Sequence, residues 1–270
     1  MVKQRLDTLL VNLNLCESRQ QAQRLIRAGD VKVNQQVIDK PGTEIDVSAD
    51  IQVQQKPKYV SRGGEKLEEA LKVFQITVEN RICLDGGIST GGFTDCLLQA
   101  GAKRVYGVDV GYGQVAWSLR QDERVMLRER TNFRYLSDRE LYGDEPPADL
   151  GVMDLSFISL TKVLETLWHL LVSPREVILL IKPQFEVGRE RVGRKGVVRD
   201  PLHQAQAIEQ VLQAAQHLGW QYGGLTRSPL TGPEGNIEYL LWLRMDGATP
   251  SPDLEAIQVI TQDAIAHFRS

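Results

Sequence analysis

The chain has 270 residues, of which 42% are hydrophobic and 25% are charged, a composition typical of globular proteins and sufficient for one large domain and a small one. The formal net charge of −3 by itself says little about nucleic-acid binding. The sequence contains no run of about 18 apolar residues, the length that a membrane-spanning helix needs. The N-terminus does not have the pattern of a signal peptide, so we expect no membrane partner. The three widely spaced cysteines form no CxxC motif, which favours a reducing, cytoplasmic location and predicts no metal site.

The charges form two basic islands on an acidic body. Residues 1–34 carry six basic and three acidic side chains, and residues 182–199 carry six basic and two acidic ones. Such islands indicate localised contacts with a polyanion, although two solvated surfaces would give the same pattern.

Two amphipathic helices are expected over residues 4–14 and 18–28, because apolar residues recur there at helical spacing. Ser18 is placed as an N-cap for the second helix, and Gly29 suits its C-terminal cap. Alternating residues then predict a strand over 31–34, a turn at Asn34-Gln35, and another strand over 44–53.

Arginines lie on and beside the second of these helices. Arg24 and Arg27 are three residues apart and share a face, a placement that suits phosphate recognition. Residues 3–53 resemble the S-four-type RNA-binding domain, through Arg5-Leu6-Asp7, Ser18-Arg19, Ala22, Leu25-Ile26, Ala28-Gly29 and Val31-Lys32-Val33-Asn34. The resemblance implies RNA contacts by Arg5, Arg19, Arg24, Arg27 and Lys32. A helical-hairpin dimerisation module is the alternative.

Polar residues and a proline over 54–61 indicate a domain boundary. We therefore expect an RNA-binding domain over 1–54, a linker over 55–61 and a catalytic domain over 62–270.

Strands and helices alternate in the second domain. A strand over 82–84 ends at Asp85, a glycine-rich loop and a helix over 93–100 follow, and a second strand over 105–108 ends at Asp109. This order is typical of an α/β, Rossmann-like, mostly parallel and doubly wound sheet.

The glycine-rich loop is suited to a nucleoside cofactor, because glycines let the backbone approach a ligand and Asp109 can accept hydrogen bonds from a ribose. The loop lacks the second glycine of the NAD fingerprint and the GK[ST] of a P-loop. Residues 111–116 do match G-x-G-x-x-A, but after the second strand. An acid followed by a glycine-rich loop is instead similar to the first motif of S-adenosylmethionine methyltransferases.

Four charged residues, far apart in the sequence, each lie at the end of an expected helix or strand. Lys66 is in the first turn of a helix, Asp154 and Lys182 are at strand ends, and Glu238 is at the start of a late strand. They resemble the Lys-Asp-Lys-Glu tetrad of FtsJ-like 2′-O-ribose methyltransferases. With the N-terminal domain, the chain resembles the TlyA (hemolysin A) family of ribosomal RNA methyltransferases over nearly its whole length. The Asp85-Gly86-Gly87 opening departs from related loops, which usually have a hydrophobic residue between the acid and the glycine.

The resemblance implies catalysis by the tetrad, S-adenosylmethionine as cofactor, and a cytidine ribose in ribosomal RNA or a ribosomal subunit as substrate. The cofactor residues that it implies are Asp85, Gly86, Gly87, Ser89, Thr90, Gly91, Gly92, Phe93, Asp109, Asn132 and Asp154.

The chemistry supports the tetrad independently. A ribose hydroxyl must lose its proton as it attacks the cofactor's methyl, and a lysine acts as base only if burial or a second ammonium lowers its pKa. If Lys66 lies near Lys182, repulsion between the two ammonium groups would lower the pKa of the lysine that acts as base. Asp154 and Glu238 would hold the two ammonium groups in place. Methylation at a pyrimidine carbon usually needs a cysteine nucleophile. It is less well supported here, because none of the three cysteines lies in the fourth-strand motif at Asp154 or in the motif that follows it.

The basic segment over 188–199 is expected to grip the RNA backbone through Arg189, Arg191, Arg194 and Lys195, with its glycines supplying mobility. Two other functions are weighed: a non-catalytic RNA-binding assembly factor on a methyltransferase fold, and a cytolysin, as the older family name suggests. The intact tetrad favours the enzyme.

Overall fold

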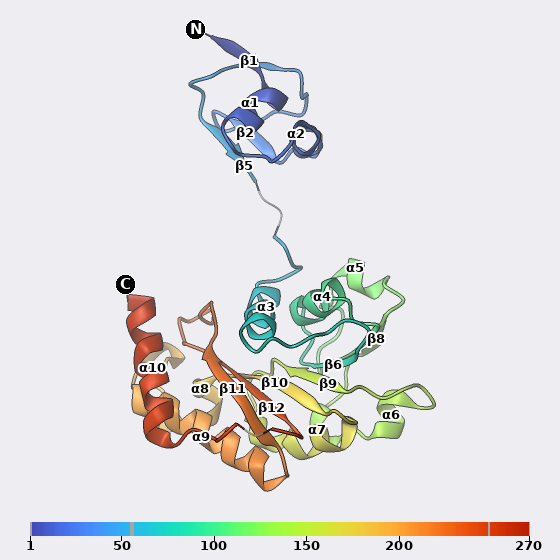
Figure 1. Ribbon diagram of the computed structural model, residues 1–270, viewed down its shortest axis with the longest axis vertical. Helices are drawn as coiled ribbons and strands as arrows, with labels where there is room; N and C mark the ends of the chain where they lie inside the picture. Colours follow the sequence, from blue (N-terminus) through green and yellow to red (C-terminus); the bar gives the residue numbers. More distant parts are fainter. Residues whose placement is uncertain (1, 55–56, 248, 270) are drawn as a thin grey trace. The chain divides into compact units, whose positions relative to one another are not determined.

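The computed structural model describes residues 2–54, 57–247 and 249–269, apart from the Arg194 side chain, and the chain divides into two compact units (Figure 1). Unit 1 comprises Met1–Lys58 and unit 2 comprises Tyr59–Ser270. Two residues of the expected linker, 55 and 56, lie outside the described residues. Tyr59, also expected in the linker, is buried in the core of unit 2.

Unit 1 combines two helices with two small sheets in its described part. Its elements are β1 (Lys3–Arg5), α1 (Leu6–Asn12), α2 (Arg19–Arg27), β2 (Val31–Val33), β3 (Gln36–Val37), β4 (Glu44–Asp46) and β5 (Ile51–Val53). Strand β1 pairs with β4, and β2 lies between β3 and β5. The apolar stripes of both helices pack with β2, so that Leu6, Leu10, Ala22, Ile26 and Val31 are fully buried.

The predicted caps and turn of unit 1 are confirmed. Ser18 precedes α2, and its Oγ accepts a hydrogen bond from the Gln21 amide at 3.3 Å. Gly29 follows α2 with a φ of +77°, a conformation that glycine adopts without steric cost. Asn34 and Gln35 both have positive φ, as expected of the turn between β2 and β3.

Two predictions for unit 1 are wrong. Residues 44–53 are not one strand, because β4 and β5 belong to different sheets. The Asp46 carboxylate accepts hydrogen bonds from the backbone and hydroxyl of Ser48, which turns the chain between the two strands. Residues 4 and 5, expected in a helix, lie in β1, where pairing with β4 satisfies their backbone groups.

Unit 2 is built on a seven-stranded sheet with the order β11-β12-β10-β9-β6-β7-β8. Its strands are β6 (Ile82–Gly86), β7 (Arg104–Val108), β8 (Val125–Arg128), β9 (Leu150–Met153), β10 (Glu176–Ile181), β11 (Gln221–Arg227) and β12 (Tyr239–Arg244). The strands from β8 to β10 are parallel, whereas β12 is antiparallel to β10 and β11. The expected mostly parallel α/β sheet is therefore confirmed.

Helices cover both faces of this sheet (Figure 1). On one face lie α3 (Gly63–Val73), α4 (Gly92–Gln99) and α5 (Trp117–Arg120), and on the other lie α6 (Asp138–Tyr142), α7 (Leu164–Leu170) and α9 (Pro201–His217). Each face has its own hydrophobic core, with Leu67 and Leu97 in the first and Leu164 and Ile208 in the second. Within the described ranges, no helix has the length and hydropathy to cross a membrane.

The last helix, α10 (Leu254–Arg269), packs mainly on α9 and to a lesser extent on the edge strand β11. Ile257 and Ala264 are buried against the second core. Between them, the Thr261 hydroxyl donates a hydrogen bond to the Pro201 carbonyl at 2.8 Å. The apolar face of this helix therefore covers another helix.

Strand β6 lies at the centre of the sheet, with β7 on one side and β9 on the other. The strand order reverses at this point, and in open α/β sheets ligands bind in the crevice beyond the carboxyl ends of such strands. The loops after β6, β7, β9 and β10 are therefore the ones that can build a site.

At the other end of the sheet, where the parallel strands begin, Arg81 binds two carboxylates. Its Nε donates to Asp149 Oδ1 and its Nη1 to Glu176 Oε2, both at 2.5 Å. Arg81 precedes β6, Asp149 precedes β9, and Glu176 begins β10. One guanidinium thus connects the amino-terminal ends of three parallel strands. The loops that can build a site lie at the carboxyl ends of these strands.

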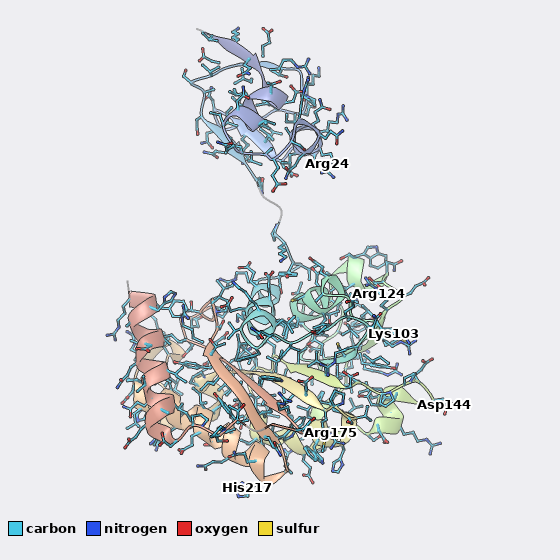
Figure 2. The ribbon with its side chains drawn as sticks, viewed as in Figure 1. Arg24, Lys103, Arg124, Asp144, Arg175 and His217 are labelled. Carbon is cyan, nitrogen blue, oxygen red and sulfur yellow. The ribbon has the colours of Figure 1, made fainter. Side chains whose placement is uncertain are left out.

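We expect Arg81→Met to lower the free energy of unfolding of unit 2 by about 2 kcal/mol, because two carboxylates that are partly buried lose their partner. Arg124→Met is the matched control, since Arg124 (labelled in Figure 2) is exposed and forms its ion pair, among the described residues, with Asp122. Urea unfolding monitored by tryptophan fluorescence measures both. Equal losses in the two variants would contradict the role given to Arg81.

Candidate active site

The loops after β6 and β9 lie in backbone contact, and glycine makes this contact possible. The Asp154 amide donates to the Gly86 carbonyl at 3.0 Å. Gly87 has a φ of +86°, and a Cβ at this position would lie 2.5 Å from the Asp154 carbonyl oxygen. A side chain at Gly87 would therefore push the two loops apart.

Asp109, directly after β7, joins the next pair of loops. Its carboxylate accepts hydrogen bonds from the Ser89 amide at 2.8 Å and the Gly111 amide at 2.7 Å. These donors orient the carboxylate at the rim of a cavity of about 450 Å³. Five of the predicted cofactor residues line this first cavity: Gly87, Ser89, Asp109, Asn132 and Asp154.

Asp85 lies beneath the glycine-rich loop and is not among the residues that line the first cavity. It is fully buried, and its Oδ2 accepts a hydrogen bond from the Thr94 hydroxyl at 2.7 Å. Its Oδ1 is buried without a hydrogen-bond partner among the described residues. Burial raises the pKa of Asp85 to about 7.

The other predicted cofactor residues take two kinds of position. Thr90, Gly92 and Phe93 line a second cavity, of about 300 Å³, beside the first. Gly86 and Gly91 line neither cavity. A Cβ on Gly86 would lie 2.5 Å from Met153 Cε, and Gly91 precedes α4 with a φ of +103°, so both allow the close packing of the loop.

The predicted catalytic residues form two ion pairs. Lys182 Nζ lies 2.6 Å from Asp154 Oδ1, and Lys66 Nζ donates a hydrogen bond to Glu238 Oε2. The first contact is an ion pair without hydrogen-bond geometry, because Asp154 Oδ1 has no hydrogen-bond partner among the described residues. Lys182 Nζ also donates a hydrogen bond to Ser156 Oγ at 2.8 Å. Both pairs are largely shielded from solvent, with side-chain exposures from 2% to 24%.

All four tetrad residues line the second cavity. This cavity shares Gly87, Ser89 and Asp154 with the first cavity. It shares Lys182 and Glu238 with a third cavity, of about 460 Å³. The tetrad therefore lies between the glycine-rich loop on one side and the third cavity on the other.

Two residues contribute to this geometry without having been assigned a role from the sequence. Ser156 accepts the hydrogen bond of Lys182. Glu186, at the end of α8 (Pro183–Glu186), is buried, and it accepts hydrogen bonds from the Ser159 hydroxyl at 2.6 Å and the Leu160 amide at 2.9 Å. Ser156 follows Asp154 by two residues and Glu186 follows Lys182 by four, but only the folded loops reveal their partners.

Glu186 connects the two loops that carry the catalytic residues. Helix α8 begins directly after Lys182, and Ser159 lies in the loop that begins at Asp154. Between the Lys182–Asp154 pair and the Glu186 contacts, the rings of Phe157 and Phe185 lie 5.2 Å apart. The two loops are therefore joined on both sides of this aromatic contact. Burial raises the pKa of Glu186.

The predicted RNA-binding residues of unit 1 are mostly at its surface. Arg5, Arg19, Arg24 and Arg27 are exposed, with Arg24 labelled in Figure 2, and Lys32 is half-buried. These positions permit contact with a polyanion.

The predicted basic segment of unit 2 borders the third cavity through Val192 and Gly196. Arg189, Arg191 and Lys195 are exposed, whereas the side chain of Arg194 lies outside the described residues. The segment forms two short 3-10 turns, over residues 189–191 and 194–196.

Asn236, two residues before Glu238, anchors this basic segment. Its Oδ1 accepts from the Val198 amide at 3.0 Å, and its Nδ2 donates to the Gly196 carbonyl at 2.8 Å. The segment is thus fastened beside the tetrad at its carboxyl end.

Comparison with known proteins matches both units. The model of the FtsJ-like methyltransferase family matches residues 59–245, and that of the S4 domain matches residues 4–51. The 16S/23S rRNA (cytidine-2′-O)-methyltransferase TlyA of Mycobacterium tuberculosis is 48% identical over 242 residues, which cover 89% of each chain. Hemolysin A of Brachyspira hyodysenteriae is 43% identical and covers 87% of this chain and 98% of its own.

Solved structures agree with these matches. A chain described as a hemolysin, from Streptococcus thermophilus, superposes with a TM-score of 0.74 at 42% identity and covers 100% of this chain and 98% of its own. A chain described as an S-adenosylmethionine-dependent methyltransferase, from Listeria monocytogenes, is 15% identical with a TM-score of 0.50, covers 69% of this chain and 100% of its own, and shares the fold alone.

We expect Asp85→Asn to remove a pH dependence from the stability of unit 2. In the folded protein the pKa of Asp85 is about 7, above its ordinary value of 3.8, so the folded state holds a proton that the unfolded state releases between these values. The free energy of unfolding of the native chain should therefore fall as pH rises from about 4 to about 7, by up to about 1.4 kcal/mol per pH unit. Urea unfolding at several pH values, without ligand, measures the gap between variant and native chain. The free energy of unfolding of the native chain minus that of the variant should fall across this window, and a difference that stays constant or rises would contradict the assignment.

Glu186→Gln should lower the rate of methyl transfer about tenfold while the KM values for cofactor and RNA change less than about twofold, because a small displacement of the catalytic loops acts on the reacting geometry. Glu255→Gln makes the same charge change at an exposed side chain in the first turn of α10, and it should leave all three constants unchanged. Steady-state kinetics separate the outcomes. A loss confined to KM would show that Glu186 does not position the catalytic loops.

Proposed function

The chain belongs to the FtsJ-like methyltransferase family, and we propose that it methylates the 2′-hydroxyl of a cytidine ribose in ribosomal RNA. The enzyme uses S-adenosylmethionine as its cofactor. The substrate is proposed from the TlyA relative, whose name states this reaction and which is 48% identical over 89% of both chains. A cytoplasmic location, where ribosomal RNA is modified, accompanies this substrate.

The observation that carries the proposal is the position of the tetrad. Lys66, Asp154, Lys182 and Glu238 line one cavity, which adjoins the glycine-rich loop. A hydroxyl that enters from the third cavity would meet Lys182 at the boundary with the second cavity, and Lys66 lines that second cavity. This arrangement suits proton removal from a nucleophile next to a bound methyl donor.

The residues of the first cavity fit the cofactor. The Asp109 carboxylate is held at the cavity rim and suits the two hydroxyls of a ribose. Asp85 is not part of this cavity's lining, but its Oδ1 beneath the loop has no hydrogen-bond partner among the described residues and suits a cationic amino group. When bound, S-adenosylmethionine supplies a methyl group that its sulfonium already activates.

Lys182 is proposed to handle the proton of the ribose hydroxyl. Asp154 and Ser156 fix its Nζ from one side, and Glu238 fixes Lys66 in the same cavity. With both amines restrained, alignment of the hydroxyl with the methyl group supplies much of the rate. Asp154 and Glu238 have the further role of balancing two neighbouring positive charges.

RNA binding is proposed for unit 1 and for the basic segment of unit 2. The S4 match and the exposed arginines of unit 1 support the first part. Arg189, Arg191 and Lys195, exposed beside the third cavity, support the second. Arg194 is included on its sequence position alone. Phosphate contacts of this kind supply affinity that falls with salt and depends little on base sequence.

Mass spectrometry of ribosomal RNA nucleosides tests the proposed function. Unmodified ribosomal subunits incubated with the enzyme and S-adenosylmethionine should gain 2′-O-methylcytidine. A methylated base with an unmodified ribose would refute the ribose reaction. The absence of any methylation, with both ligands bound, would favour a non-catalytic RNA-binding factor.

Lys182→Ala should reduce single-turnover methyl transfer at least about 1,000-fold, with S-adenosylmethionine and RNA still bound, because proton removal is lost at the reacting hydroxyl. Lys182→Arg should fail to restore the rate, since a guanidinium remains protonated and cannot act as a base. Calorimetry and RNA binding provide the controls. A Lys182→Arg enzyme with near-native turnover would exclude Lys182 as the base.

A further inference from the structure

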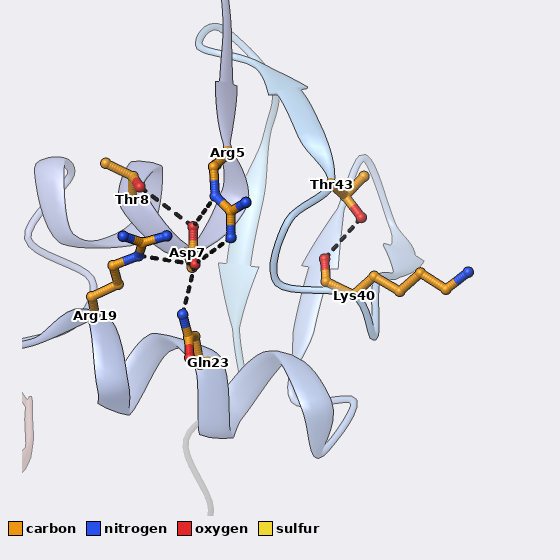
Figure 3. Close-up of polar contacts among 7 residues, drawn as sticks. All are labelled: Arg5, Asp7, Thr8, Arg19, Gln23, Lys40 and Thr43. Atoms are coloured by element: carbon orange, nitrogen blue, oxygen red, sulfur yellow. Dashed lines mark hydrogen bonds and ion pairs between the residues drawn. The ribbon is translucent and has the colours of Figure 1, made fainter.

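The buried carboxylate of Asp7 organises the surface of unit 1. Asp7 is the second residue of α1 and is fully buried. Four side chains donate hydrogen bonds to it from β1, α1 and α2 (Figure 3). The donors are Arg5 Nε and Nη2 at 3.1 and 3.0 Å, Arg19 Nε at 3.0 Å, Gln23 Nε2 at 2.9 Å and Thr8 Oγ1 at 3.3 Å.

These contacts engage only one edge of each guanidinium. Arg5 binds Asp7 through Nε and Nη2, and Arg19 binds through Nε. A guanidinium carries five N–H donors in a rigid plane, so both arginines keep donors that point away from Asp7. The Arg5 and Arg19 side chains are 49% and 56% exposed, whereas that of Asp7 is 0% exposed.

The backbone also constrains the orientation of Arg5. Its guanidinium lies across Gly42, where an added Cβ would lie 3.3 Å from Nη1 and 3.5 Å from Cζ. The adjacent turn is fastened to α1, because the Leu6 amide donates to the Thr43 carbonyl at 2.8 Å and the Asp7 amide to the Pro41 carbonyl at 3.1 Å. Arg5 therefore has packing on one side and an ion pair on another.

The arrangement holds two cations close together on a small unit. Two guanidinium groups that bind one carboxylate would repel each other without it, and their hydrogen bonds keep the pKa of Asp7 well below its usual range. One arginine would satisfy a buried carboxylate structurally. The second brings four further N–H donors to the same place, where a phosphodiester with two anionic oxygens could accept from both groups.

We propose that Asp7 is a positioning residue that fixes Arg5 and Arg19 as a preorganised binding site for an RNA phosphodiester. This proposal rests on RNA being the substrate. Prior orientation reduces the side-chain entropy lost on binding, so the pair binds phosphate more strongly than two mobile arginines of the same charge would.

Charge and geometry predict opposite results for Asp7→Asn. Removal of a negative charge from a basic surface should tighten binding to RNA if charge alone matters. We expect about tenfold weaker binding instead, because the arginines lose their anchor. Asp39→Asn in the same unit is the matched control: Asp39 is exposed, the charge change is identical, and binding should stay equal or become slightly tighter.

The measurement is fluorescence anisotropy of the full chain with a labelled ribosomal RNA hairpin at fixed salt. Unchanged or tighter binding by Asp7→Asn, or equal weakening by Asp39→Asn, would overturn the proposal. Calorimetry with S-adenosylmethionine, which concerns unit 2, verifies that the remainder of each variant is intact. The wild-type methylation assay is read separately, so a failure of the proposed reaction is distinguishable from a failure of this site.

A second variant covers the case in which Asp7→Asn does not fold. The double substitution Arg5→Lys with Arg19→Lys keeps both charges and leaves Asp7 paired, but an ammonium bound to Asp7 has no second edge to present. We expect about tenfold weaker RNA binding with a nearly unchanged melting temperature of unit 1. Native affinity in this variant would show that charge, and not the fixed orientation, carries the binding.

Discussion

The ion pair between Lys182 and Asp154 is the interaction on which the arrangement of the site depends. It connects the loops after β9 and β10, two parallel strands whose carboxyl ends reach the same edge of the sheet. Because parallel pairing fixes the register of these strands, it also fixes where both side chains begin. The Lys66–Glu238 pair then adds α3 and the start of β12 to the same cavity.

In both units, an acidic side chain that is shielded from solvent orients basic side chains. These basic side chains lie at the surface of unit 1 and in a cavity of unit 2. Asp7 holds two guanidinium groups in unit 1, and Glu238 holds Lys66 in unit 2. Such pairs contribute little net stability, because desolvation offsets much of the attraction. Their value is conformational, since a fixed cation meets its ligand without first losing rotamer freedom.

The sequence predicts the local chemistry better than the partnerships between distant loops. Strand, glycine loop and acid in sequence are enough to place Asp109 at the end of β7, because a periodic pattern and a short loop are local properties. The break between β4 and β5 is missed, since the alternating pattern continues through the Asp46 turn. The contact of Glu186 with Ser159 joins residues 27 positions apart in sequence, and no spacing rule links two loops through a buried carboxylate. Similarly, α10 has an apolar face, but periodicity does not say whether a sheet or a helix covers it.

The central claim is that the tetrad acts on a ribose hydroxyl, and a substrate with one atom removed tests it most directly. Ribosomal RNA assembled with a 2′-deoxy sugar at only the target cytidine keeps its base and the neighbouring phosphates. With radiolabelled S-adenosylmethionine, the account predicts binding of this RNA with no label at the target, because the acceptor oxygen is missing. Label transferred to the deoxy-substituted nucleotide at the native rate would contradict the account and assign the methyl group to the base.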